Sequence, residues 1–109
     1  MDRQLELEVN ALHAQVCAAL SEPRRILMLY ALADGPMNVS DICKTLRLAQ
    51  PLASRHLKVL RDGGLVIARR EGMNVYYTLS SPKIVRALDL LRQVLNEHLR
   101  HTASLVSNA

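Results

Sequence analysis

The sequence predicts a mainly α-helical fold with one small β-hairpin. Apolar residues recur at helical spacing over most of the chain, which indicates amphipathic helices. One of these helical patterns ends at the pair Gly63-Gly64, and two short β-prone runs follow it directly. A last helical pattern closes the chain. The expected order is therefore helix, helix, helix, helix, strand, strand, helix, which is the order of a winged helix-turn-helix.

The first expected helix covers residues 1–20. Its apolar residues lie at steps of four and three, so they form a single stripe: Leu5, Val9, Leu12, Val16 and Ala19. The second helix should begin after Ser21, a residue type that caps helix N-termini, with Pro23 in its first turn. The run Asp34-Gly35-Pro36 should end it.

Residues 38–62 read as a helix-turn-helix. A short third helix is expected to begin near its cap, Asn38, and a turn follows at Arg47-Leu48-Ala49. The fourth helix should run from Gln50 to Arg61, where the two glycines end it because they can adopt positive φ. Its inward residues should be Leu52, Ala53, Leu57 and Leu60.

Residues 65–79 read as a hairpin, here called the wing. Its strands are expected over Leu65–Ala68 and Val75–Leu79, joined across the charged segment Arg69–Asn74. A long helix should then run from Pro82 to about His101, followed by a frayed tail. Its apolar spacing is again helical: Ile84, Leu88, Leu91 and Leu95.

The length of 109 residues allows one domain, residues 1–109. The two terminal helices, residues 1–20 and 82–101, carry coiled-coil-like apolar stripes in a chain too small to bury both fully. We therefore expect a homodimer that forms through these helices. The alternative is that both stripes pack inside the monomer.

Composition points to a folded, basic protein. Half of the residues are hydrophobic, 22% are charged and the net charge is +4. Residues 1–22 carry four acidic side chains and one basic, so the excess positive charge lies in the rest of the chain and predicts a basic working surface there. We find neither a run of about 20 apolar residues nor a signal peptide. The expected location is the cytoplasm, without a membrane partner.

The fourth helix is the expected DNA-reading element. The second helix of a helix-turn-helix lies in the major groove, where Gln reads adenine and Arg reads guanine. Gln50, Ser54 and Arg55 are the candidates for contacts with base edges. His56 and Lys58 lie on the same helix at other angles, so contact with phosphate, or packing, is expected for them.

The wing should supply further contacts. Arg69, Arg70 and Asn74 are expected to reach phosphates or the minor groove beside the helix. The alternative is that these Arg and Lys residues form only a solvated basic face without a DNA partner. The order of helix, Gly-Gly and hairpin argues against this alternative. The chain has no Trp and no Phe, so it lacks the usual stacking platforms for single-stranded nucleic acid and RNA. Double-stranded DNA is the expected partner.

Three strings of the sequence resemble the ArsR/SmtB family of bacterial winged-helix repressors. They are LSEPRRILML for the second helix, VSDICKTLRLAQPLASRHLKVLRDGGLV for the helix-turn-helix and RREGMNVYYTL for the wing. The resemblance covers roughly Val16 to Leu99. It implies a dimeric, autoregulating, sequence-specific repressor that binds an inverted repeat, with half-sites about 34 Å apart. It also implies release on a metal, metalloid or redox signal.

The same resemblance does not locate the signal. Positions that hold cysteines in many metalloid sensors are here Met37, Asn38 and Ser40, and those of the zinc sensors are Ser81, Lys83, Val94 and Glu97. The cysteine pair of the redox sensors falls near Tyr30 and Asn96. The family's thiolates are therefore missing, and of the zinc-sensor positions only Glu97 could bind a metal.

Two other groups are candidate sensors. Cys17 and Cys43 could form a redox-active thiol pair or bind a thiophilic metal or metalloid ion, and the alternative is two structural thiols. Glu97, His98 and His101 are a weaker candidate metal site, with exposed polar residues as the alternative. No cofactor is certain.

Three rival functions remain on sequence grounds. They are a constitutive repressor, a nonspecific architectural DNA-binding protein, and a winged helix that binds only protein. We find no nucleophile-base pair, phosphate loop or metalloprotease helix, so an enzyme is not expected.

Overall fold

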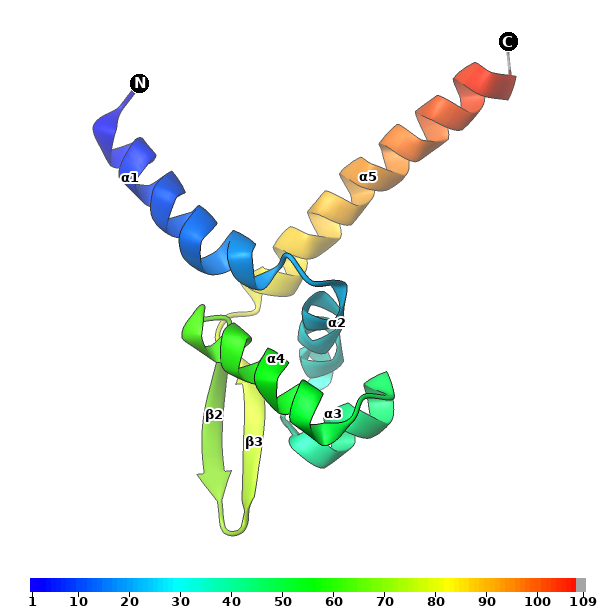
Figure 1. The fold of residues 1–109 in the computed structure, drawn as a ribbon. Coiled ribbons are helices and arrows are strands. Elements are labelled where there is room, and N and C mark those ends of the chain that lie inside the picture. Colours follow the sequence, from blue (N-terminus) through cyan, green and yellow to red (C-terminus); the bar gives the residue numbers. More distant parts are fainter. Residues whose placement is uncertain (108–109) are drawn as a thin grey trace.

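The computed structural model describes residues 1–107 and has the winged helix-turn-helix fold that the sequence predicts (Figure 1). Its main elements in chain order are α1 (Arg3–Ala11), α2 (Pro23–Ala31), β1 (Met37–Asn38), α3 (Val39–Leu46), α4 (Gln50–Asp62), β2 (Val66–Glu71), β3 (Asn74–Leu79) and α5 (Lys83–Ser107). A π-helical segment, Leu12–Cys17, continues α1, and a short 3-10 turn, Leu32–Asp34, follows α2.

The core lies between α2, α3, α4 and the sheet. Its largest fully buried side chains come from the three helices: Met28, Leu29, Ile42, Leu57 and Leu60. Burial of one such side chain stabilises the fold by roughly 1.5–3 kcal/mol relative to its exposure. The helix-turn-helix is thus held by apolar contacts with α2, which leaves the other side of α4 free.

The start of α2 differs from the prediction. Glu22, not Ser21, is the N-cap, because its carboxylate accepts the backbone N–H of Arg24. Ser21 instead donates its hydroxyl hydrogen to the carbonyl oxygen of Ala18 at 2.7 Å. Ser21 therefore closes the end of the preceding helix, and Pro23 occupies the first turn of α2 as expected.

The helix-turn-helix begins as predicted. Asn38 caps α3, since its Oδ1 accepts the backbone N–H of Asp41 at 2.8 Å. The turn depends on Arg47, a non-glycine residue in the left-handed region with φ of 55°. The backbone N–H of Leu48 then bonds to the carbonyl of Cys43 at 3.0 Å, which closes α3 and directs the chain into α4.

The wing is longer and tighter than predicted. Strands β2 and β3 pair antiparallel out to Glu71 opposite Asn74, so only Gly72 and Met73 form the turn, where Gly72 has φ of 63°. The segment Arg69–Asn74, expected as a loop, is therefore largely strand. A third strand, β1, pairs with β3 through Met37 and Tyr77. Two residues are too few to show strand periodicity, so the sequence did not reveal β1.

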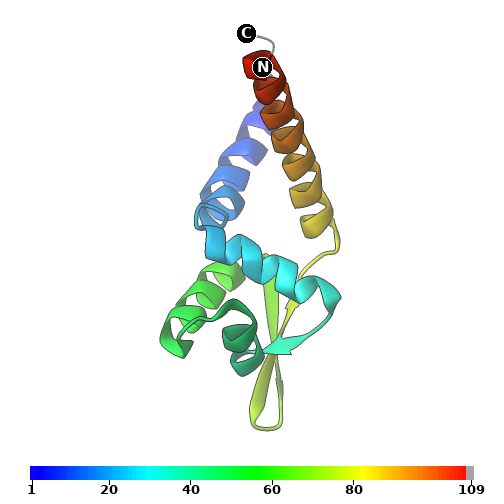
Figure 2. The ribbon, with the colours of Figure 1, turned by 90° about the vertical axis from the view of Figure 1, so that its right-hand side faces the viewer.

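The terminal helices extend away from the core on the same side (Figures 1 and 2) and diverge from each other in the view of Figure 1. The helix α5 reaches Ser107, which corrects the predicted end near His101. The stripe of the first helix stays exposed at Leu5, Val9 and Leu12, and only its last residues pack against the core. The alternative in which both stripes pack within one monomer is therefore wrong. No helix among residues 1–107 combines the length and apolarity that a membrane crossing requires.

Candidate nucleic-acid interface

The outer face of α4 is polar and exposed. The buried side of the helix carries Ala53, Leu57 and Leu60, whereas the candidate contact residues are exposed: Gln50, Ser54, Arg55 and Lys58. The helical period places Arg55 and Lys58 on the side opposite the buried residues and Ser54 beside them, while Gln50 is exposed in the first turn of the helix. The structure thus presents the predicted base-reading residues as free side chains on one helix.

Lys58 differs from the other exposed residues of α4. Its Nζ lies 2.7 Å from Oδ2 of Asp62, one turn along the same helix. The hydrogen bond from Lys58 lowers the pKa of the Asp62 carboxyl, so Asp62 is a carboxylate at neutral pH. A DNA phosphate would have to compete with this carboxylate for Lys58, and Arg55 is the less encumbered cation.

His56 is corrected by the structure. Its side chain is buried, with 7% exposure, and its Nδ1 lies 3.3 Å from a guanidinium nitrogen of Arg25 on α2. The ring therefore packs between α4 and α2 and does not face solvent. We remove His56 from the predicted DNA-contacting residues, and keep the packing role that the sequence analysis left open for it.

The wing places basic side chains at the same end of the molecule as the start of α4. Both lie away from the two chain termini (Figures 1 and 2). Arg69, Arg70 and Asn74 are all exposed. In the register, Arg70 stands opposite Val75 and Asn74 stands opposite Glu71, near the turn. A helix followed by a basic hairpin can contact a major groove and the adjoining backbone of one duplex.

Two arginines were missed as candidates in the sequence. Arg47 is exposed in the left-handed turn directly before α4, so it adds a cation beside the first turn of the candidate reading helix. The sequence signal that could have identified Arg47 was its position as an arginine in the turn before the predicted reading helix. Arg25 is half-buried and joins three segments of the fold, and no sequence pattern indicated this role.

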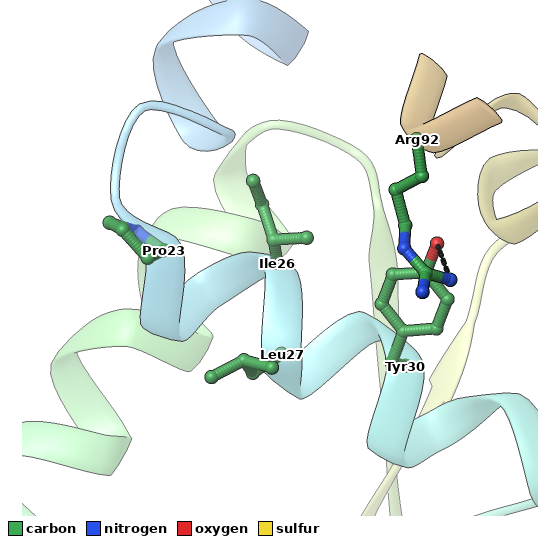
Figure 3. A pocket seen from close by; sticks show the side chains of 5 residues that line it. All are labelled: Pro23, Ile26, Leu27, Tyr30 and Arg92. Atoms are coloured by element: carbon green, nitrogen blue, oxygen red, sulfur yellow. Dashed lines mark hydrogen bonds between the residues drawn. The ribbon is translucent and has the colours of Figure 1, made fainter. Parts of the chain in front are cut away.

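A hollow of about 450 Å³ lies between α2 and α5, lined by Pro23, Ile26, Leu27, Tyr30 and Arg92 (Figure 3). At its edge the Arg92 guanidinium carbon stands 5.3 Å from the centroid of the Tyr30 ring. An Arg92 nitrogen also lies 3.5 Å from the Tyr30 hydroxyl. The hollow is mostly apolar and lies at the base of α5, next to the exposed apolar residues of that helix.

The two thiols are not joined in the structure. Cys17 is exposed, Cys43 is half-buried against the core, and both are free. Cys17 ends the π-helical segment on one side of α2, and α3, which carries Cys43, lies on the other side (Figures 1 and 2). The structure thus does not bring together the thiol pair considered in the sequence.

The C-terminal metal candidates also stay apart from other ligands. Glu97, His98 and His101 are exposed on α5. Over residues 1–107, no three His, Cys, Asp or Glu side chains come together in a way that could hold a metal ion. Any metal on these residues would need ligands from another chain.

Comparisons with known proteins agree with this geometry. The chain is 37% identical over 90 residues to the transcriptional activator HlyU of Vibrio cholerae. The aligned region covers 82% of this chain and 83% of that protein. It is 32% identical over 105 residues to a transcriptional repressor SmtB homolog of Synechocystis, and this aligned region covers 92% of this chain and 76% of that protein.

A solved structure shows the same fold. The homodimeric winged helix-turn-helix DNA-binding domain of Mb0332 from Mycobacterium bovis superposes with a TM-score of 0.78 at 34% identity, covering 93% of each chain. Residues 22–68, from the cap of α2 into the wing, match the family model described as "Bacterial regulatory protein, arsR family". The chain therefore belongs to the arsR family of bacterial regulatory proteins.

Proposed function

We propose that the protein is a homodimeric repressor that binds an inverted repeat in double-stranded DNA. The observation that carries this proposal is the division of the molecule into two ends. The polar face of α4 and the basic wing lie at one end, whereas the apolar stripes of the terminal helices extend from the other. One end suits DNA and the other suits a second copy of the chain.

The exposed apolar residues of the terminal helices support the dimer. In α5 they lie at helical spacing on the part that extends beyond the core: Leu91, Val94, Leu95 and Leu99. A monomer that exposed such a stripe would lose the free energy gained by covering it, about 25 cal/mol per Å² of apolar surface. The domain of Mb0332, which has the same fold, is homodimeric. Two-fold symmetry would then present two copies of α4 to two half-sites.

The contacts proposed with DNA follow from side-chain chemistry. Arg55 can donate two hydrogen bonds to a guanine edge, and Gln50 can bond both edge atoms of an adenine. Arg69 and Arg70 would neutralise phosphates, which adds affinity more than discrimination. Repression is the proposed direction because a dimer bound over a promoter would block transcription, and the Synechocystis relative is named a repressor. HlyU is named an activator, so the direction needs its own test.

A thiol-reactive signal is the inducer class that the chain favours. Cys17 is exposed close to the apolar stripe of the first helix, so its modification would alter the surface proposed for the dimer. The test compares operator binding by reduced and mildly oxidised protein, with Cys17→Ser and Cys43→Ser variants. Release that Cys17→Ser abolishes supports the signal, whereas equal binding in both states rules out the thiols and leaves a metal ion at His98 and His101, or no inducer.

The central test is sequence discrimination. An operator duplex would be selected from a random-sequence library by the wild-type protein, and its affinity compared with that of a scrambled duplex by fluorescence anisotropy. Arg55→Ala should weaken operator binding by about 10- to 100-fold, since a good bidentate contact is worth ~1–3 kcal/mol. Arg61→Ala, an exposed arginine at the other end of α4, is the matched control and should bind normally.

The rival functions give different results in that test. A nonspecific architectural protein would bind both duplexes alike, and a winged helix that binds only protein would bind neither. A promoter-reporter fusion then separates repression from activation, because deletion of the protein should raise expression from a repressed promoter.

A further inference from the structure

The guanidinium of Arg25 connects three segments of the fold. Its Nε donates to the carbonyl oxygen of Ala19 at 2.7 Å, and its second terminal nitrogen reaches the Ala18 carbonyl and the Ser21 hydroxyl, each at 3.4 Å. Its first terminal nitrogen lies 3.3 Å from Nδ1 of His56. One side chain of α2 thus contacts the end of the first helix, the following turn and α4.

These contacts reach the end of the first helix, where the last carbonyls have no bonds within the helix. Nε of Arg25 donates to the Ala19 carbonyl, whereas the Ala18 carbonyl also accepts a hydrogen bond from the Ser21 hydroxyl. His56 is buried on α4, with 7% exposure, and its Nδ1 faces the guanidinium of Arg25. Arg25 therefore fixes the end of the first helix relative to α4, because one nitrogen of its planar guanidinium bonds Ala19 and another contacts His56.

A second contact holds the same two helices together. Gly63, at the end of α4, packs directly on the first helix. A Cβ at position 63 would lie only 3.0 Å from the carbonyl oxygen of Gln15 and 3.2 Å from Cβ of Ala19. The absence of a side chain therefore permits this close approach. Helix α4 is thus held to the first helix at two of its residues, at His56 through Arg25 and at Gly63 by direct packing. Two such contacts fix the angle between α4 and the first helix.

We propose that Arg25, through His56, is a positioning residue that sets the geometry of the two DNA-reading helices in the dimer. The first helix carries an apolar stripe proposed for dimerisation, and α4 carries the residues proposed to read DNA. Fixing one on the other fixes how far apart, and at what tilt, the two copies of α4 stand. This inference rests on the proposed dimeric operator binding, and it assigns a role to residues outside the proposed DNA-contacting set and outside the apolar stripes of the terminal helices.

The ring of His56 must be neutral in this arrangement. Because Nδ1 accepts from Arg25, the ring proton lies on Nε2, which is buried and has no hydrogen-bond partner among residues 1–107. Burial lowers the pKa of His56, and the positive charge of Arg25 lowers it further. A second ring proton, on Nδ1, would place an N–H donor against the N–H donor of Arg25, and a positive imidazolium against the positive guanidinium. Protonation of His56 therefore breaks its contact with Arg25.

Other charged groups act on this ring more weakly. Glu22, at the start of α2, raises the pKa of His56, whereas Arg24 on α2 and Arg55 on α4 lower it. The direction is thus set by burial and Arg25, which agree. Positioning of α4 should be intact near neutral pH and should weaken as His56 is protonated in acid.

The test uses two duplexes. One carries the selected operator with both half-sites, and the other has one half-site scrambled. Arg25→Gln should reduce affinity for the intact operator at least tenfold, yet change affinity for the single half-site less than twofold, because each reading head stays folded. Arg24→Gln is the matched control. It alters the adjacent exposed arginine of α2 and should keep the wild-type preference for two half-sites.

Variants of His56 test the other partner of the Arg25–His56 contact. His56→Asn keeps an acceptor near the position of Nδ1 but does not titrate, so it should keep the preference at pH 7.5 and also at pH 5.5. The wild-type protein should show a weaker preference at pH 5.5 than at pH 7.5, and His56→Leu should lack the preference at both. Urea unfolding and sedimentation velocity verify that each variant is folded and dimeric.

Each outcome has a distinct meaning. If wild-type protein does not prefer two half-sites to one, the proposed dimeric operator binding fails. If it does and Arg25→Gln shows the same preference, the positioning role is overturned while the repressor stands. An equal loss of affinity for both duplexes would also overturn it, since that result reports general destabilisation.

Discussion

Tyr30 donates a 2.7 Å hydrogen bond from its hydroxyl to Oδ1 of Asp89, and so joins α2 to the long helix α5 across 59 positions of sequence. Arg92, 3.4 Å from the same carboxylate oxygen, lies over the Tyr30 ring. Beyond this point α5 extends away from the core (Figure 1). The direction of α5 therefore depends on a polar contact at its base as well as on apolar packing.

Removal of this hydroxyl should be measurable. Tyr30→Phe deletes the hydrogen bond and leaves the partly buried carboxylate of Asp89 with fewer donors, which should lower the free energy of unfolding by about 1 kcal/mol. Urea denaturation followed by circular dichroism gives the value. Tyr76→Phe is the control, because Tyr76 is half-buried in the wing and its hydroxyl has no hydrogen bond in the described structure. Equal effects of the two substitutions would contradict the prediction.

The cap of α3 is a second point at which one side chain should matter. Asn38→Ala removes the acceptor for the Asp41 N–H and should destabilise the protein by about 0.5–2 kcal/mol. Ser40→Ala, two positions along and exposed, should change the free energy of unfolding by less than about 0.5 kcal/mol. Urea unfolding of both variants tests this, and no difference between them would refute the role of the cap.

The wing arginines should act through charge. If Arg70 contacts phosphate, Arg70→Ala should weaken binding to operator and random duplexes by the same factor. It should also reduce the slope of log affinity against log salt by about 0.9 per protomer. Anisotropy titrations over a range of salt concentrations measure the slope. Arg100→Ala, far along α5, is the charge-matched control. An unchanged slope for Arg70→Ala would place the wing away from the backbone.

Stability should fall in acid because of His56. Its pKa is lowered from the ordinary 6.5 by burial, so below pH 6.5 the unfolded chain binds a proton that the folded chain resists. This contribution to stability is fully present above pH 6.5 and is lost as the pH falls below it. The loss of unfolding free energy between pH 8 and pH 5 should be smaller for His56→Asn than for the wild-type protein. Identical losses would show that His56 does not contribute.

Much of the fold could be predicted from local pattern. The periodicity of apolar residues located the helices, since each helix must bury one face, and the cap at Asn38 and the end of α4 after Arg61 follow from local backbone chemistry. Exposure of Gln50, Ser54 and Arg55 could be predicted for the same reason. Boundaries were less certain where two signals compete, as for the caps Ser21 and Glu22.

Other features depend on contacts between distant segments. The strand β1 exists because β3 offers it a free edge, and the strands of the wing extend further than their apolar residues because pairing continues to the turn at Gly72. His56 shows the limit most clearly. Its position on α4 allowed either DNA contact or packing, and only the approach of α2 buried its ring.

The sequence by itself determined the order of the long helices and the wing strands and the side chains exposed on α4, because these follow from short-range periodicity and capping. Its resemblance to the ArsR/SmtB family indicated the family. Only the tertiary structure decided which residues connect the elements. Arg25 reaches the first helix and His56, and Tyr30 reaches Asp89, across gaps in sequence that no local pattern spans. The physical reason is that such hydrogen bonds form only after apolar packing has brought their segments together, so the positions of both partners are set by the whole fold.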